Sequence, residues 1–229
     1  MKYISLPDLK DRRLTFFLAM EEYVARCLDE PDGFFLWQVA PTVIYGRNQV
    51  AENEVNFDYC REYGIEVVRR KSGGGCVYAD RDNLMLSFIS IGDNVGFAFN
   101  RFMGMVLLVL RKMGVEAVGT SHNDILIGGR KVCGTACYHV AGRSIVHSTM
   151  LYDTNMEHIT HAITPSHEKL QKKGIESVRQ RITLLKDHTT LTLDEVKTLV
   201  RDTLCDGERV LSETEVAEIE KLEKKYLEE

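Results

Sequence analysis

The segment best suited to chemistry runs from Arg69 to Asp80, where Arg70, Lys71 and Ser72 lead into three consecutive glycines. Glycine lets backbone N–H groups approach a ligand closely and adopts positive φ without strain. Successive N–H groups in such a turn form a concave anion site, and adjacent cations favour phosphate or carboxylate. The run is neither a P-loop nor a dinucleotide fingerprint, because its glycines are contiguous. It predicts a nucleotide-phosphate site on a strand–turn–strand unit, with a flexible hairpin tip as the alternative.

A second candidate is Lys131, which lies just beyond the tip of a hairpin expected at Gly128-Gly129. The small residues at 134–136 leave room for a molecule to lie against the strand, where Lys131 could hold a carboxylate or a phosphate. Asn123 and Asp124 precede the hairpin, and the Asp124 carboxylate suits a magnesium ion bound through water or phosphate oxygens. The alternatives are a solvated lysine and two turn-capping side chains.

Strand alternation places three more chemically active side chains on the face of Lys131, namely Cys133, Cys137 and His139. One interpretation is a metal site completed by Cys76 or His147, although the spacing matches no zinc pattern. A second is a Cys133 thiolate activated by Lys131. A third is that the cysteines fill small apolar slots. A bulge at Gly134 would break the alternation.

Composition narrows the function classes. The 229 residues carry 29 basic and 34 acidic side chains, so the net charge of −5 argues against a general attraction to nucleic acid. No apolar run reaches the ~20 residues that span a bilayer, and the first residues lack the features of a signal peptide. Six cysteines without a disulfide-like spacing indicate a reducing, cytoplasmic setting.

Hydrophobic periodicity predicts an α+β fold with a largely antiparallel sheet flanked by helices. Residues 123–152 form an antiparallel meander in this prediction, in which His147 either orients a substrate or satisfies a structural hydrogen bond. An amphipathic helix is expected at 12–30 and a buried helix at 97–113. The remaining strands are expected at 34–39, 42–45, 65–70 and 83–91, and the remaining helices at 53–63, 155–163, 166–173, 193–206 and 212–227.

Several motifs that follow one another in order resemble the lipoate-protein ligase A family, within the wider biotin/lipoate ligase catalytic fold. They cover most of residues 12–185, which makes the resemblance more specific than any single motif. The residues that carry it are Gly46-Arg47-Asn48-Gln49, Arg69 through Tyr78, Asp82-Asn83-Leu84 with Ser87-Phe88, Asn123-Asp124-Ile125, Gly129-Arg130-Lys131, His147 through Leu151, Lys169-Leu170-Gln171, Lys173-Gly174-Ile175, Ser177-Val178-Arg179 and Arg181-Ile182-Thr183.

The resemblance implies an enzyme that joins lipoate to ATP, releases pyrophosphate and passes the lipoyl group from lipoyl-adenylate to a lysine of a lipoyl domain. It implies that Arg70 and the backbone at 75–78 contact the nucleotide, that Lys131 bridges carboxyl and phosphate, and that Asp124 holds Mg²⁺. The implied binding residues are Arg70, Ser72, Gly74, Gly75, Cys76, Val77, Tyr78, Asn83, Asn123, Asp124, Lys131, Gly134, Thr135, Ala136 and His147.

The implied partners are lipoyl domains of 2-oxoacid dehydrogenase complexes or the glycine-cleavage H protein. We expect a catalytic domain at 1–185 with C-terminal helices at 186–229 packed on it. A separate C-terminal accessory domain, common in such ligases, is not expected in this chain, so an accessory chain is a further implied partner. The alternatives are a lipoyl or octanoyl transferase that uses a preactivated donor, and a non-catalytic module that docks a lipoyl domain. Cys133 stands where many relatives have serine.

Overall fold

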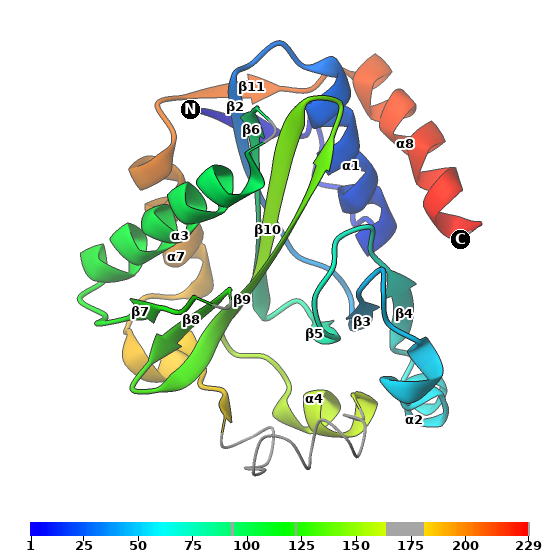
Figure 1. The fold of residues 1–229 in the computed structure, drawn as a ribbon, viewed down its shortest axis with the longest axis vertical. Coiled ribbons are helices and arrows are strands. Elements are labelled where there is room, and N and C mark those ends of the chain that lie inside the picture. Colours follow the sequence, from blue (N-terminus) through cyan, green and yellow to red (C-terminus); the bar gives the residue numbers. More distant parts are fainter. Residues whose placement is uncertain (93, 122, 164–180, 229) are drawn as a thin grey trace.

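The computed structural model describes residues 1–92, 94–121, 123–163 and 181–228. A mixed eight-stranded sheet runs through the middle of the molecule (Figure 1), and only its β11–β1 and β1–β2 pairs are parallel. This confirms the predicted α+β fold with a largely antiparallel sheet. In spatial order the strands are β11 (Gly207–Val210), β1 (Lys2–Ser5), β2 (Asp32–Trp37), β6 (Asn83–Ile91), β10 (Arg143–Leu151), β9 (Arg130–Val140), β8 (Asp124–Ile127) and β7 (Val118–Gly119).

Helices cover both faces of this sheet (Figure 1). On one face α1 (Leu14–Cys27) lies against the strands, and α8 (Glu213–Leu227) packs on α1. On the other face lie α3 (Val95–Lys112) and α7 (Leu193–Leu204). The C-terminal segment therefore contributes to both layers and, through β11, to the sheet itself.

Side-chain alternation along the central strands builds one hydrophobic core on each face. In β2, Phe35 and Trp37 pack toward α1, whereas Phe34 packs toward α3. In β6, Met85 faces α1 and Leu84 faces α3. A strand covered on both faces has no polar side, which explains why the sequence of β6 reads as a nearly continuous apolar run.

A second, three-stranded sheet stands beside the large one and carries the glycine turn. Its order is β4–β3–β5, so β3 separates the two strands that the glycine turn connects. Short helices lie in the segments that connect its strands to each other and to the rest of the chain. The elements are β3 (Thr42–Tyr45), β4 (Glu66–Arg69), β5 (Val77–Ala79), α2 (Phe57–Glu62), α4 (Met156–Ala162) and the single-turn helices η1 (Ala51–Asn53) and η2 (Leu185–His188).

Two helix predictions need correction. The helix expected to be amphipathic, α1, is buried on every side from Leu14 to Ala25. Its outer face is covered by α8, a long-range contact that periodicity along α1 alone does not reveal. The helix expected to be buried, α3, buries one face around Phe102 and leaves Phe97 and Leu108 exposed.

The structure also adds elements that the sequence analysis missed. Strands β1, β7 and β11 are four residues or shorter, too short to show a period. The helix predicted at 166–173 and the family motifs between 169 and 179 lie outside the described residues. Within the described ranges, no helix has both the length and the apolar composition that a membrane span requires.

Candidate active site

A cavity open to solvent lies where the α1 face of the large sheet meets the small sheet. Both segments that the sequence singled out, the glycine turn and the hairpin with Lys131, contribute to its wall. The lining residues are Leu18, Trp37, Ile44, Arg70, Gly74, Gly75, Cys76, Val77, Met85, Asn123, Lys131, Gly134, Thr135, Ala136, His147, Ser148 and Thr149.

Arg70 organises the glycine turn from inside. Its side chain directly follows β4 and the residue is 5% exposed. The guanidinium donates to the carbonyl oxygens of Ile44 at 3.1 Å, Gly73 at 2.8 Å and Gly75 at 2.7 Å, and its Nε donates to Ser72 Oγ at 3.0 Å. Burial lowers the pKa of Arg70 to about 10, so the group remains a cation at neutral pH. The turn is thus wrapped around a fixed positive charge.

Two glycines make this close approach possible. A Cβ on Gly46 would lie 2.3 Å from the Gly74 carbonyl oxygen and 3.2 Å from Arg70 Nη2. Gly74 itself has φ of +96°, a conformation that other residues rarely adopt. The turn at 46–49 and the glycine turn at 73–75 are therefore packed backbone to backbone.

Lys131 approaches the cavity from the opposite hairpin and is held far more loosely. Its Nζ lies 2.7 Å from Asp124 Oδ1, and both side chains are about a third exposed, 33% and 32%. A Cβ on Gly134 would lie 2.6 Å from Lys131 Nζ, so glycine at this position leaves room for the ammonium group. Asn123, at φ of 78°, anchors the start of β8 by donating to the Thr135 carbonyl at 2.6 Å.

A register shift in this hairpin overturns the predicted placement of the cysteines. Opposite Ile125 and Leu126, β9 carries one extra residue, Val132. The bulge flips the alternation, so Cys133 turns away from Lys131 into the core beneath α3, where it is 0% exposed. Burial raises the pKa of its thiol to about 11, which leaves no thiolate at neutral pH. A bulge was anticipated, but at Gly134.

The same flip places Cys137 against the α3 core, while His139 is exposed. In the part of the chain that the structure describes, no three His, Cys, Asp or Glu side chains gather to hold a metal ion. The metal site considered for these residues therefore has no support in the structure.

His147 lies between the α1 face and the glycine turn. Its Nδ1 is 2.9 Å from the Glu21 carboxylate, and its Nε2 is 2.7 Å from Ser72 Oγ. Glu21 was missed by the sequence analysis, although a signal exists: Glu21 and Glu22 are two adjacent acidic residues in the middle of a mostly apolar helix segment. The hydrogen bonds show that His147 has a structural role and also forms part of the cavity wall.

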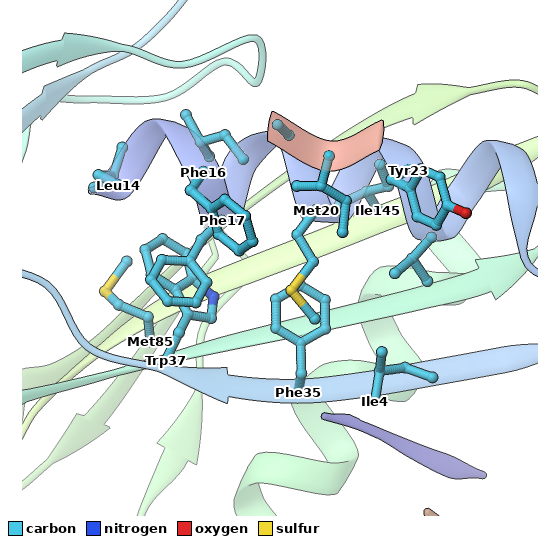
Figure 2. Packing of buried hydrophobic residues seen from close by; sticks show 14 of the residues in the cluster. Ile4, Leu14, Phe16, Phe17, Met20, Tyr23, Phe35, Trp37, Met85 and Ile145 are labelled. Atoms are coloured by element: carbon cyan, nitrogen blue, oxygen red, sulfur yellow. The ribbon is translucent and has the colours of Figure 1, made fainter. Parts of the chain in front are cut away.

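The individual residues of the apolar wall were likewise not predicted. Leu18, Trp37, Ile44 and Met85 supply it from four different elements. The ring of Phe17 stacks on Trp37 with centroids 4.9 Å apart, as Figure 2 shows beside Met85. Apolar residues in a strand read as core from sequence, and nothing local distinguishes the few that face a cavity.

The structure brings most, but not all, of the predicted site residues together. Ser72 is fully buried behind the cavity wall, where it contacts two residues that line the cavity, Arg70 and His147. Asp124 likewise contacts a lining residue, Lys131. Tyr78 and Asn83 lie elsewhere. Tyr78 packs in the core beside α4, and Asn83 donates to Thr154 Oγ1 at 3.1 Å. The other predicted residues all line the cavity.

This arrangement suits an anion joined to an apolar chain. The lining combines a buried guanidinium, an ammonium group and a glycine turn with aliphatic and aromatic side chains. Two cations from separate hairpins can stabilise negative charge that develops between them, as in phosphoryl or acyl transfer.

Comparison with known proteins agrees with this chemistry. The model of the lipoyl protein ligase A/B catalytic domain family matches residues 14–205. Lipoate-protein ligase LplJ of Bacillus subtilis is 39% identical over 184 residues, which are 80% of this chain and 55% of that protein. Lipoate–protein ligase 1 of Staphylococcus aureus is 36% identical over 95% of this chain and 65% of its own length. The chain thus spans between half and two thirds of these relatives.

Two solved structures share the fold over nearly the whole chain. The chain from a study of a bi-partite lipoate protein ligase and its E2 lipoyl domain from Thermoplasma acidophilum superposes with a TM-score of 0.85 at 27% identity, covering 98% of this chain and 92% of that one. A lipoate-protein ligase A bound with ATP gives a TM-score of 0.83 at 25% identity, covering 98% and 94%.

Proposed function

Because the chain belongs to the lipoyl protein ligase A/B catalytic domain family, we propose that it activates lipoate with ATP and transfers the lipoyl group to a lysine of a lipoyl domain. The observation that carries the proposal is the convergence of Arg70 and Lys131, from two separate hairpins, on one cavity with an apolar wall. A carboxylic acid with an apolar tail, together with a triphosphate, fits this combination of two cations and an apolar wall.

In this proposal the lipoyl chain lies along Trp37 and Met85, and its carboxylate attacks the α-phosphorus of ATP. The bond to pyrophosphate breaks and a mixed anhydride, lipoyl-adenylate, forms. Lys131 neutralises charge on the attacking carboxylate and the α-phosphate, and the N–H groups of the glycine turn around Arg70 hold the phosphate.

The second step is attack by the neutral amine of the acceptor lysine on the acyl carbon. The amide forms, the bond to AMP breaks, and the amine releases a proton. Lys131 then faces the oxyanion of the tetrahedral intermediate. No nucleophilic side chain is needed, because adenylation already makes the acyl group electrophilic. The buried thiol of Cys133 agrees with a reaction of this kind.

The residues fit a magnesium ion only as a companion of the nucleotide. Asp124 supplies one carboxylate beside Lys131, and phosphate oxygens would complete the set, which is how Mg²⁺ is commonly held in nucleotide sites. Such an ion would neutralise phosphate charge.

The proposed acceptors are lipoyl domains of 2-oxoacid dehydrogenase complexes or the glycine-cleavage H protein. A second candidate function is transfer from preformed lipoyl-adenylate, with activation dependent on an accessory chain. The observation that favours it is the 92% coverage of the Thermoplasma chain, whose structure was studied as part of a bi-partite ligase.

Mass spectrometry of an apo lipoyl domain tests the proposal. The protein is incubated with this domain, lipoate, ATP and Mg²⁺, and in parallel with the domain and synthetic lipoyl-adenylate. A lipoyl mass gain with pyrophosphate release in the first reaction supports the ligase. A gain only in the second supports the transferase, and addition of octanoyl-loaded acyl carrier protein identifies an octanoyl transferase. Binding of the domain without any mass gain would leave a docking module and overturn both enzymatic proposals.

A further inference from the structure

Glu21 is a fully buried carboxylate that the proposed reaction does not use. It lies in the middle of α1 and is 0% exposed. Its oxygens contact Ser87 Oγ at 2.5 Å and His147 Nδ1 at 2.9 Å. A buried carboxylate is costly unless hydrogen bonds and charge compensate it, so these two contacts must explain its presence.

The direction of the first hydrogen-bond chain is fixed by Trp37. The indole Nε1–H can only donate, and it lies 2.8 Å from Ser87 Oγ. Ser87 therefore accepts from Trp37, and its single hydroxyl proton points to Glu21 Oε1. Trp37 is a wall residue of the cavity, so this chain ties the apolar wall to Glu21.

The second chain begins at Arg70. A guanidinium also only donates, and its Nε–H points to Ser72 Oγ at 3.0 Å. Ser72 Oγ lies 2.7 Å from His147 Nε2, and His147 Nδ1 lies 2.9 Å from the Glu21 carboxylate. A Ser72 hydroxyl that donates to Nε2 leaves the imidazole proton on Nδ1, from which it is donated to Glu21. In this arrangement both chains end on the same carboxylate, which accepts every hydrogen bond.

We infer that Glu21 is a positioning residue that locks the glycine turn, through Ser72 and His147, and the apolar wall, through Ser87 and Trp37, to one buried charge. The carboxylate balances the buried Arg70 guanidinium across two neutral groups. It also gives the two halves of the cavity a common anchor. This last point rests on the proposed function: the residues that would bind the lipoyl chain and those that would bind the phosphate are positioned by the same carboxylate.

An amide at position 21 cannot do the same. A carboxylate offers two acceptor oxygens, whereas glutamine offers one acceptor and one donor. In Glu21→Gln either His147 or Ser87 faces an N–H group, so one chain must reverse or break. The adjacent Glu22 provides a matched control, because it contacts Arg26, Lys71 and Tyr226.

The first measurement is the tautomer of His147, read from ¹⁵N NMR of histidine-labelled protein without any ligand. We expect the proton on Nδ1 in the wild type and in Glu22→Gln, and a changed Nδ1 signal in Glu21→Gln. A wild-type His147 protonated on Nε2 would overturn the proposal.

The second measurement uses Trp37, which is the single tryptophan of the sequence. Loss of the indole hydrogen-bond acceptor in Ser87→Ala shifts its fluorescence emission, and Glu21→Gln shifts it in the same direction. Ser72→Ala and Glu22→Gln leave it unchanged. Equal emission from wild type and Ser87→Ala would contradict the Trp37 chain even if Glu21→Gln fails to fold.

The third measurement separates the two halves by calorimetric binding of ATP with Mg²⁺ and of lipoate. Loss of one hydrogen bond predicts about fivefold weaker ATP binding in Ser72→Ala and about fivefold weaker lipoate binding in Ser87→Ala, with both weakened in Glu21→Gln. Identical losses in both serine variants would overturn the division into two chains. If the wild type binds neither ligand, the proposed function fails, whereas the tautomer and the emission still decide the role of Glu21.

Discussion

The two cations of the cavity, Arg70 and Lys131, are held in opposite ways. Arg70 is almost completely buried and donates to three carbonyl oxygens and a hydroxyl. Lys131 is about a third exposed and forms an ion pair with Asp124. The first cation is part of the fold, and the second is available to a ligand. A charge used as a scaffold and a charge used in chemistry can thus be distinguished by what already binds them.

The energetics sharpen the contrast. Hydrogen bonds to charged groups contribute roughly 1.5–3 kcal/mol each, and carbonyls left unpaired by removing Arg70 would remain buried. A partly exposed ion pair such as Lys131–Asp124 is worth only about 0–1 kcal/mol, so a carboxylate or phosphate can replace Asp124 at little cost.

The largest expected effect comes from Lys131→Ala. In the proposed reaction Lys131 stabilises charge in both steps, so its removal should slow lipoyl transfer at least ~100-fold. The melting temperature should stay close to that of the wild type, because only a partly exposed ion pair is lost. Single-turnover transfer from lipoyl-adenylate, followed by mass spectrometry, measures the rate.

Arg130→Ala is the matched control for this variant, since Arg130 is the exposed neighbour on the same strand and does not line the cavity. It should transfer at close to the wild-type rate. A Lys131→Ala protein that turns over normally would remove Lys131 from the mechanism.

Arg70→Lys should show the reverse pattern, a loss of stability that accompanies the loss of activity. Lysine keeps the charge but cannot donate in several fixed directions, so carbonyls of Ile44, Gly73 or Gly75 lose their partner. We expect the free energy of unfolding to fall by about 3 kcal/mol in urea titrations. A stability equal to the wild type would show that the guanidinium does not hold the turn.

Gly46→Ala tests the same scaffold without touching a charge. The added methyl group would lie 2.3 Å from the Gly74 carbonyl oxygen, a backbone atom that cannot rotate away. Overpacking of this kind should cost about 2 kcal/mol and weaken ATP binding, because the glycine turn must move outward. Gly73→Ala is the control, since its Cβ would meet no atom of the described residues within 4 Å. Equal effects of both variants would argue against close packing of the two turns.

The sequence predicted the hairpin of Lys131 well because its determinants are local. Gly128 and Gly129 both adopt positive φ, 56° and 79°, as the tight turn demands. The register beyond the turn could not be predicted. Whether Val132 is accommodated as an extra residue depends on the core beneath α3, which is built from distant segments. A bulge at Val132, earlier in the strand than the one considered at Gly134, reversed the faces that strict alternation gives to the side chains that follow.

The cationic residues of the cavity could also be predicted, because their sequence signals are local. The residues of its apolar wall could not. Charge and glycine are rare enough in sequence to mark a site. Trp37 and Met85 instead alternate like any core residues of their strands, and only the gap between the two sheets distinguishes them. Glu21 is an intermediate case. Its charge within a mostly apolar helix distinguishes it in the sequence, but its hydrogen-bond partners come from β6 and β10 and could not be predicted.

The smallest expected effect is that of Cys133→Ser, which tests whether the Lys131 hairpin contains a hidden nucleophile. Serine is slightly smaller and more polar, and Ser148 and Thr135 lie close enough to hydrogen-bond the side chain at 133. We expect a loss of stability of about 1 kcal/mol, a typical cost for a polar group in an apolar core, with transfer unchanged.

Cys137→Ser, half-buried on the same side of β9, is the companion variant for this test. Chemical denaturation and the single-turnover transfer assay measure both proteins. An inactive but folded Cys133→Ser would mean that the thiol reaches the reacting carbon despite the bulge. The Lys131 hairpin would then supply a covalent nucleophile as well as a loosely held cation. The difference between the two hairpins would no longer be only how firmly each holds its cation.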